Sequence, residues 1–465
     1  MLGAFVSRNQ FPVGHGGFHA GRIRAVTWLR SFPPLHRSTL EQKSFLDLVY
    51  VFDCGSEHPD AFTRSLQKYR SNYPDHLDFL FLSHIHADHI NGVDRLLGYT
   101  VPRVLVLPYL DLEDVAAIAL SDYQEGRFSA SYREYLRDPG AWWRGRGVET
   151  IIFIQPGGDD GIAPVAPTPD QPIEGEGIPT VREGEIEQPD ARLAPILQKP
   201  QGPIEPGLTL ADPNSRALPK SNVLAGSGSV FRLEWRYEDK DAWRSADWFL
   251  VPYVNPVQQA NRAAFRKALL EYLQLSLPTP EEFRARLLEE LSSTEQAKAL
   301  VDIYSENFGS NHNAVSLSLY SGPGHSEQSY RNRERAWHFW ESSPNFALHH
   351  THLNGQTPGG WLSTGDAMLK EKKRRLPWHQ FFSRYEQTIG ILTLPHHGSI
   401  HNFHEDVINW SRLHLVLATT VEAKGRVARI RETLDYAAAK GQIALVVDDQ
   451  PASILTSESS RAFGL

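Results

Sequence analysis

Short apolar runs separated by polar turns organise the first part of the chain. Runs of this kind predict strands over 22–32, 46–56, 78–82 and 101–110, and the amphipathic spacing over 61–73 predicts a helix. Strands and helices that alternate at this rhythm indicate α/β layers.

The last third of the chain shows the same β-rich pattern. Apolar runs there predict further strands within "NAVSLSLYSG", "GGWLSTGDAML", "TIGILTLPHHGS", "LHLVLATTVEA" and "QIALVVDD". Before them, residues 257–305 have a helical pattern, in which Thr279 as N-cap, Pro280 and Glu282 form a helix-start signature.

Residues 156–225 differ in composition from both β-rich parts. The stretch is rich in proline, glycine and acidic residues and poor in aromatic ones. Such a segment cannot bury enough apolar area to offset the entropy lost on ordering, so we expect a disordered, flexible insert. A structureless insert of this length inside a domain is unusual and is often functional.

These patterns divide the chain into four parts. A first β-rich half (1–155) is followed by the flexible insert (156–225), a helical insertion (226–305) and a second β-rich half (306–465). We expect the two halves to form one domain that the insert and the helices divide.

Composition narrows the class of protein. The 465 residues are 41% apolar and 22% charged, which is globular usage, and the net charge of −8 argues against sequence-blind coating of nucleic acid. Cys54 is the single cysteine, so an intrachain disulfide and a thiolate zinc cluster within one chain are excluded. We find no signal-peptide pattern and no apolar run of membrane-spanning length, so we expect a cytoplasmic protein.

Histidine and aspartate gather where the strand over 78–82 ends, in "SHIHADH". Side chains alternate along an extended segment, so His84 and His86 point to the same side and can reach one ion. Asp88 and His89 follow on the next turn and could hold a second ion. Imidazole and carboxylate ligands suit Zn²⁺, Mn²⁺ or Fe²⁺. The alternatives are a hydrogen-bonded polar loop and a non-catalytic zinc site.

Two later apolar strands also end in residues that can bind metal. Asp366 ends "GGWLSTGD", where a carboxylate is costly unless it is coordinated or hydrogen-bonded, although it could also cap a turn. His396 ends "IGILTLP" and should project over the same edge as His84. Neighbouring residues of an extended chain point to different sides, so we do not expect His396 and His397 to bind one ion together.

"SHIHADHINGV" resembles the HxHxDH signature of the metallo-β-lactamase superfamily, whose fold is an αββα sandwich. Further segments resemble the soluble domain of the DNA-uptake protein ComEC and its relatives: "VFDCGS", "SNHNAVSLSLYS", "TGDA" and "PHHGS". Two departures stand out. The first is a "VGQGD"-like turn, which is replaced here by "FPVGHGGFHAG" with His15 and Gly17. The second is a "GHP" segment, whose histidine is absent from "LATTVEAKGRVARI". The absence of this histidine puts full occupancy of a second metal site in question.

The resemblance implies roles for particular residues. Asp366 would bridge two divalent ions, Zn²⁺ or Mn²⁺, that are also held by His84, His86, Asp88 and His89. His396 would bind the second ion, and His397 would orient phosphate or donate a proton. Asp88 would in addition position the attacking water. His312 is the best-placed candidate for a further ligand of the first ion; otherwise it is a surface histidine.

Candidate substrate contacts follow the same edge. Gly398 and Ser399 would let backbone and hydroxyl groups approach an anion. The basic run "KEKKRR" supplies Lys372, Lys373 and Arg374, which could bind a polyanion backbone if the run lies beside the metals and otherwise form a solvated face.

These features predict a metal-dependent phosphodiesterase, and the likeness to ComEC points to DNA as its substrate. One alternative keeps the site but changes the substrate to a small phosphodiester, a lactone or a thioester. Another is a regulated or vestigial site in a binding component of a larger assembly. Soluble domains of this type resemble components of bacterial anti-phage systems, some alongside a protease, so the 156–225 insert could be a cleavage site or a lid.

Overall fold

The computed structural model describes most of the chain. The described residues are 2–28, 42–124, 126, 128, 130–156, 190–198, 209–210, 221–236, 244–255, 259–276, 278–308, 315–324, 331–336, 353–355, 358–421 and 424–463.

Strands from both ends of the chain form the first layer of the fold. Following the hydrogen-bonded pairs, it runs β13, β12, β18, β1, β2, β3, β4, β5, β6. The pairing is antiparallel from β13 to β3 and parallel from β3 to β6. The bounds of these strands are β1 Leu2–Gln10, β2 His19–Trp28, β3 Gln42–Phe52, β4 Leu77–Phe81, β5 Pro102–Pro108, β6 Thr150–Gln155, β12 Arg331–Arg335, β13 Leu353–Gly355 and β18 Leu455–Phe463.

The second layer continues from β6 through the long strand β9 and runs β9, β10, β11, β14, β15, β16, β17. Its last four strands are parallel, and β7 and β8 also pair with β9. The bounds are β7 Asp190–Gln198, β8 Thr209–Leu210, β9 Asn222–Arg236, β10 Arg244–Val254, β11 Leu317–Pro323, β14 Gly360–Ser363, β15 Ile389–Thr393, β16 Leu415–Thr419 and β17 Ile443–Val447.

The two layers pack face to face although they belong to one continuous sheet. The rings of Phe79 on β4 and Phe231 on β9 lie 4.8 Å apart, and the Tyr50 hydroxyl on β3 donates to Ser321 Oγ on β11 at 2.9 Å. The fold therefore differs from the simple αββα sandwich expected from the sequence, because β9 joins the layers into a single large mixed sheet.

A buried arginine links the layers at their centre. Arg8 on β1 is fully buried and donates to Ser321 O on β11 and to Ser457 Oγ on β18. Its guanidinium also lies 5.4 Å from the ring centre of Trp248 and 5.6 Å from that of Trp361. A buried cation is tolerated where hydrogen bonds and aromatic faces replace its water.

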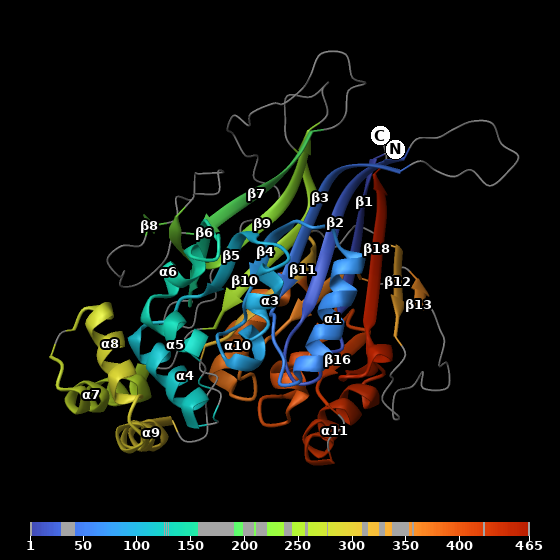
Figure 1. Ribbon diagram of the computed structural model, residues 1–465. Coiled ribbons are helices and arrows are strands. Elements are labelled where there is room, and N and C mark those ends of the chain that lie inside the picture. The colour runs from blue at the N-terminus through green and yellow to red at the C-terminus, as the bar shows by residue number, and fades with distance from the viewer. Residues whose placement is uncertain are drawn as a thin grey trace, which may run out of the picture.

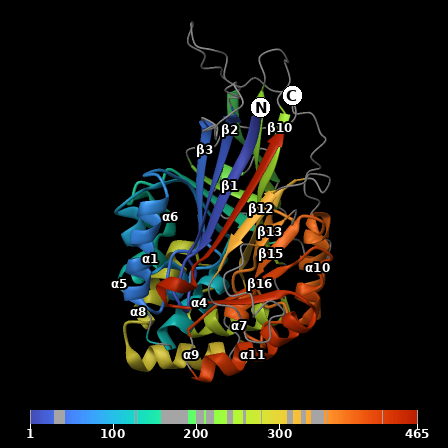
Figure 2. The ribbon, with the colours of Figure 1, turned by 90° about the vertical axis from the view of Figure 1, so that its right-hand side faces the viewer.

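Helices cover the outer sides of the layers, and Figure 2 shows α1 on one side of the strands and α10 on the other. Tyr73, directly after α1, donates to Ala20 O of β2, and Trp378 of α10 donates to Ser318 Oγ of β11. Helices α4 to α9 gather beside one end of the first layer (Figure 1). The bounds are α1 Pro59–Asn72, α2 Ala87–Ile90, α3 Val93–Leu97, α4 Leu112–Gln124, α5 Ala130–Arg137, α6 Pro139–Arg144, α7 Gln259–Leu273, α8 Pro280–Glu290, α9 Thr294–Phe308, α10 Lys372–Phe382 and α11 Lys424–Ala439.

Strands in the middle of the chain correct two expectations. The insert expected to be disordered over 156–225 contains β7 and β8, and the helical insertion expected over 226–305 begins with strand residues of β9 and β10. Glycine and serine in "NVLAGSGSVFRLEWR" weaken the apolar pattern of this strand, which pairs with β6, β7, β8 and β10. The helices expected after it are present as α7, α8 and α9, and residues 157–189 lie outside the described part.

Within the described ranges, none of the helices combines the length and apolar character needed to span a lipid bilayer.

The N-cap of α8 gives a local test of the fold. Thr279 Oγ1 accepts from the Glu282 amide at 3.2 Å, and the Glu282 carboxylate accepts from the Thr279 amide at 2.9 Å. Replacing Thr279 with alanine should destabilise the start of α8 by about 1 kcal/mol. Hydrogen exchange at the Glu282 amide should accelerate accordingly, whereas Thr279→Ser, which keeps the hydroxyl, should exchange as the native chain does.

Candidate metal centre

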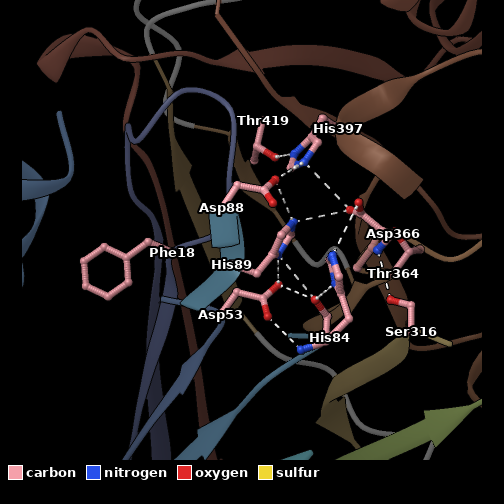
Figure 3. Close-up of polar contacts among 12 residues, drawn as sticks. Phe18, Asp53, His84, Asp88, His89, Ser316, Thr364, Asp366, His397 and Thr419 are labelled. Carbon is pink, nitrogen blue, oxygen red and sulfur yellow. Dashed lines mark hydrogen bonds and ion pairs between the residues drawn. The ribbon is translucent and has the colours of Figure 1, made fainter. Parts of the chain in front are cut away.

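The candidate site lies where parallel strands of both layers end. Asp53 follows β3, the 84–89 cluster follows β4, Asp366 follows β14, and the 396–397 pair follows β15. Carboxyl ends of parallel strands are a common position for ligand sites because loops there can converge from several strands. Figure 3 shows side chains from both layers directed toward one another at this edge.

Hydrogen bonds at Nδ1 orient the imidazoles of His84 and His89. Ser83 Oγ donates to Asp53 Oδ2 at 2.8 Å and therefore accepts from His84 Nδ1 at 2.9 Å. His89 Nδ1 donates to Asp53 Oδ2 at 2.9 Å. With the proton on Nδ1, each ring keeps its lone pair on Nε2.

His397 is held in a similar way. Its Nδ1 lies 3.1 Å from Thr419 Oγ1 at the end of β16, and the ring is buried. Its Nε2 therefore faces the same carboxylates as the Nε2 atoms of His84 and His89 (Figure 3).

The Nε2 atoms converge on Asp366 from two sides. His84 Nε2 lies 3.7 Å from Asp366 Oδ2, whereas His89 Nε2 and His397 Nε2 lie 3.5 and 3.8 Å from Asp366 Oδ1. The same two imidazoles approach Asp88 Oδ2 at 3.4 and 3.5 Å. The Asp366 carboxylate thus lies between His84 on one side and Asp88, His89 and His397 on the other.

These donor atoms fit a cation. Among the described residues, the buried Nε2 atoms of His84, His89 and His397 have no hydrogen-bond partner. An imidazole lone pair that faces a carboxylate oxygen at this distance is unfavourable unless a proton or a cation lies between them. Three sets of possible ligand atoms lie within 4.8 Å of one another: His84, Asp88 and His89; His89, Asp366 and His397; His15, Asp88 and His397.

Burial and neighbouring charges shift the pKa values of the histidines and aspartates in the site. Burial alone would lower the pKa of His89, but Asp88, Asp53 and Asp366 outweigh it and raise that pKa well above its ordinary value. Burial and the neighbouring His89 lower the pKa of His84 well below its ordinary value. Burial opposes ionisation of Asp88 and Asp366, yet the surrounding imidazoles outweigh it and hold both carboxyl pKa values well below their usual range.

The backbone around Asp366 fixes its carboxylate. Gly365 has a φ of +55°, and a Cβ there would meet Ser316 Oγ and Ser83 Cβ at 2.6 Å each. The Asp366 amide donates to Ser316 Oγ at 3.0 Å. Glycine therefore lets the turn after β14 approach both β11 and the segment that precedes His84.

The structure places His396 and His397 differently from the extended pair that the sequence led us to expect. Both residues have positive φ values, +47° and +57°, so they form a left-handed turn rather than an extended pair. His397 lies beside Asp88 and His89, where His396 was expected, and His396 Nε2 lies 3.8 Å from Asp366 Oδ2, on the His84 side. The His396 side chain is 36% exposed, whereas that of His397 is 4% exposed.

The remaining expected residues divide into those near the cluster and those apart from it. The rings of His86 and His84 lie 4.8 Å apart, which brings His86 to the His84 side. Lys372 and Lys373 are exposed at the start of α10, and Ser399 is partly exposed. His312 lies outside the described residues.

Arg374, which was expected as a possible contact for a polyanion, is mostly buried. Its side chain is 9% exposed, and its Nε lies 3.4 Å from Glu371. The helical register of α10 turns this residue toward the protein, which separates it from the exposed lysines before it.

Residues that orient the ligands were not identified from the sequence as part of the site. Ser83 directly precedes His84 and Thr419 ends β16, and neither type of residue signals a metal site by itself. Asp53 was visible as a strand-end carboxylate in "VFDCGS", but its hydrogen bond to His89 depends on the parallel pairing of β3 with β4. His15 was visible only as a departure from the related turn.

A family model supports a metal site in the part that the first half of the chain contributes. The model of the metallo-beta-lactamase superfamily matches residues 47–170, a range that contains Asp53 and the whole 84–89 cluster. Proteins of that superfamily are mostly metal-dependent hydrolases. No curated protein matches the chain.

Removing the carboxylate that orients His89 tests the arrangement. One Asp53 carboxylate oxygen accepts from the Ser83 amide and the other accepts from the Ser83 hydroxyl and from His89 Nδ1. Asp53→Asn keeps only one accepting oxygen and cannot replace both, so the His89 ring should lose its fixed orientation. We expect the affinity for Zn²⁺ to fall about 10–100-fold, measured by calorimetric titration. Asp60→Asn, an exposed change in the first turn of α1, is the matched control. Equal affinity of Asp53→Asn and the native chain would show that Asp53 does not orient a ligand.

Proposed function

We propose that the protein is a metal-dependent phosphodiesterase and that DNA is its substrate. The observation that carries the hydrolytic part is the convergence of buried, non-hydrogen-bonded Nε2 atoms from His84, His89 and His397 on the carboxylates of Asp88 and Asp366. The superfamily match over 47–170 supports the same class of reaction.

The proposed ligand sets follow from the geometry. His84, His86 and Asp366 Oδ2 would hold one ion, and Asp88, His89, His397 and Asp366 Oδ1 the other. The buried donors are imidazole and carboxylate without thiolate, which suits Zn²⁺ or Mn²⁺. Two such ions lower the pKa of a shared water and stabilise the charge that develops on a phosphate.

The protein groups would divide the remaining work. Asp366 would fix the spacing of the two halves, because its oxygens face different imidazoles. Asp88, buried between His89 and His397, would orient the attacking water. His396 is the more exposed imidazole of the 396–397 pair and would therefore meet the scissile phosphate or protonate the leaving oxygen, the role first expected for His397.

The choice of DNA rests on the resemblance to the soluble domain of ComEC. The segments that carry this likeness, "TGDA" and "PHHGS", are the ones that contain Asp366 and the 396–397 pair. Lys372 and Lys373 are exposed and would contact the phosphate backbone, and Ser399 would contact the phosphate nearest the metals.

An anti-phage role with a partner protease that cuts within 156–225 is part of this proposal. Higher nuclease activity after clean cleavage in that segment would support it.

Activity on separate substrate classes tests the proposal. Purified protein with Mn²⁺ or Zn²⁺ should cut DNA faster than RNA, a small phosphodiester, a lactone or a thioester. Asp88→Ala should lower the rate about a thousandfold, which corresponds to about 4 kcal/mol of transition-state stabilisation.

His76→Ala is the matched control, since His76 lies before β4, at the opposite end of the strand from the cluster. Chelation should abolish activity, and added metal should restore it. A metal-restored rate that is highest on a lactone or thioester would favour the small-substrate alternative. Cleavage that Asp88→Ala and the native chain perform equally would contradict the assignment of the site.

A further inference from the structure

The glycine-flanked turn around His15 is fixed against the metal centre. Gly14 and Gly16 have φ values of +73° and +140°, which favour glycine. The Gly14 amide donates to Asp448 O at 3.1 Å, and His15 O accepts from the Glu57 amide at 2.9 Å. Both sides of the turn are therefore held by the backbone of other segments.

Close backbone contact brings this turn to the 84–89 cluster. A Cβ on Gly16 would meet Gly55 O at 2.5 Å and Asp88 O at 2.7 Å, so a larger residue could not be placed there without displacing the chain. A Cβ on Gly17 would meet Asp53 Cβ at 2.5 Å. The missing side chains on Gly16 and Gly17 are what let the turn lie directly on the residues that form and orient the site.

The His15 side chain reaches the group around Asp88. Its ring centre lies 3.9 Å from that of His397, and possible ligand atoms of His15, Asp88 and His397 all lie within 4.8 Å of one another. The side chain is 18% exposed, and its Nε2 lies 4.0 Å from Glu57 Oε1. The His15 imidazole therefore lies with Asp88 and His397, two of the proposed ligands of the second ion.

The turn also lies beside the segment "TTVEA", which begins at the end of β16 and contains no histidine. A Cβ on Gly14 would meet Val421 Cγ1 at 2.7 Å, so the turn that carries His15 is in direct contact with the start of this segment.

We propose that His15 is a ligand of the second divalent ion and reaches it from the N-terminal turn. The second ion would then be held by His15, Asp88, His89, His397 and the Oδ1 atom of Asp366. This inference rests on the proposed metal-dependent function. It assigns His15 a metal-binding role that contact of its ring with His397 alone would not give it.

Metal titration separates the two roles of His15. We would titrate metal-free native protein, His15→Ala, His15→Gln and His76→Ala with Zn²⁺ by calorimetry, and repeat the titration with Co²⁺ while recording its visible absorption, which depends on coordination number and ligand type. His15→Gln retains a flat polar side chain beside His397 but removes the imidazole. His76→Ala removes a histidine from the other end of β4.

The expected result is selective. The native chain and His76→Ala should bind two ions, whereas His15→Ala and His15→Gln should bind one of the two at least about tenfold less tightly and with an altered Co²⁺ spectrum for that equivalent. The affinity for the other ion should not change.

Two other results would overturn the inference. Wild-type affinities and Co²⁺ spectra in both His15 variants would show that His15 is no ligand while leaving the metal-dependent function intact, and a spectrum retained in His15→Gln alone would reduce His15 to a packing role. Failure of the native chain to bind either ion would contradict the proposed function itself.

Discussion

The site depends on imidazoles whose Nδ1 atoms are fixed by hydrogen bonds, so that their Nε2 lone pairs face one buried carboxylate, that of Asp366. Ser83 and Asp53 fix His84 and His89, and Thr419 contacts His397 in the same manner. Turning any one ring away would break a buried hydrogen bond, so the lone pairs cannot avoid Asp366. A divalent cation between them would relieve the unfavourable contact and would use every group in the orientation it already has.

The course of the sheet explains how distant residues meet in this way. Because β9 leads from the first layer into the second, the parallel strands β3 and β4 come to face β14, β15 and β16 across the core. Their carboxyl ends then share one edge, and every proposed ligand lies within eight residues of a strand end. Arg8 on β1 links the two layers through its hydrogen bond to β11 and its contacts with the rings of Trp248 and Trp361.

From the sequence, the meeting of strand-end residues at one edge could be predicted, whereas positions that depend on the backbone conformation of turns could not. His84, His86 and Asp366 were predictable because each follows an apolar strand, and the strand ends meet at one edge. The order of His396 and His397 was not, because the prediction assumed an extended chain and the pair has positive φ values. His15 could not be placed from the sequence, since its position depends on backbone contacts of Gly16 with Gly55 and Asp88. Strand β9 was missed because its glycine and serine residues weaken the apolar pattern expected of a strand.

Anomalous X-ray diffraction at the absorption edge of a supplied metal, Zn²⁺ or Mn²⁺, tests the central claim most directly. We predict two peaks about 3.5–4 Å apart on opposite sides of the Asp366 carboxylate, one at ligand distance from His84 and the other from Asp88 and His397. Ordered side chains at these positions without an anomalous peak between them, in crystals grown with excess metal, would contradict the account.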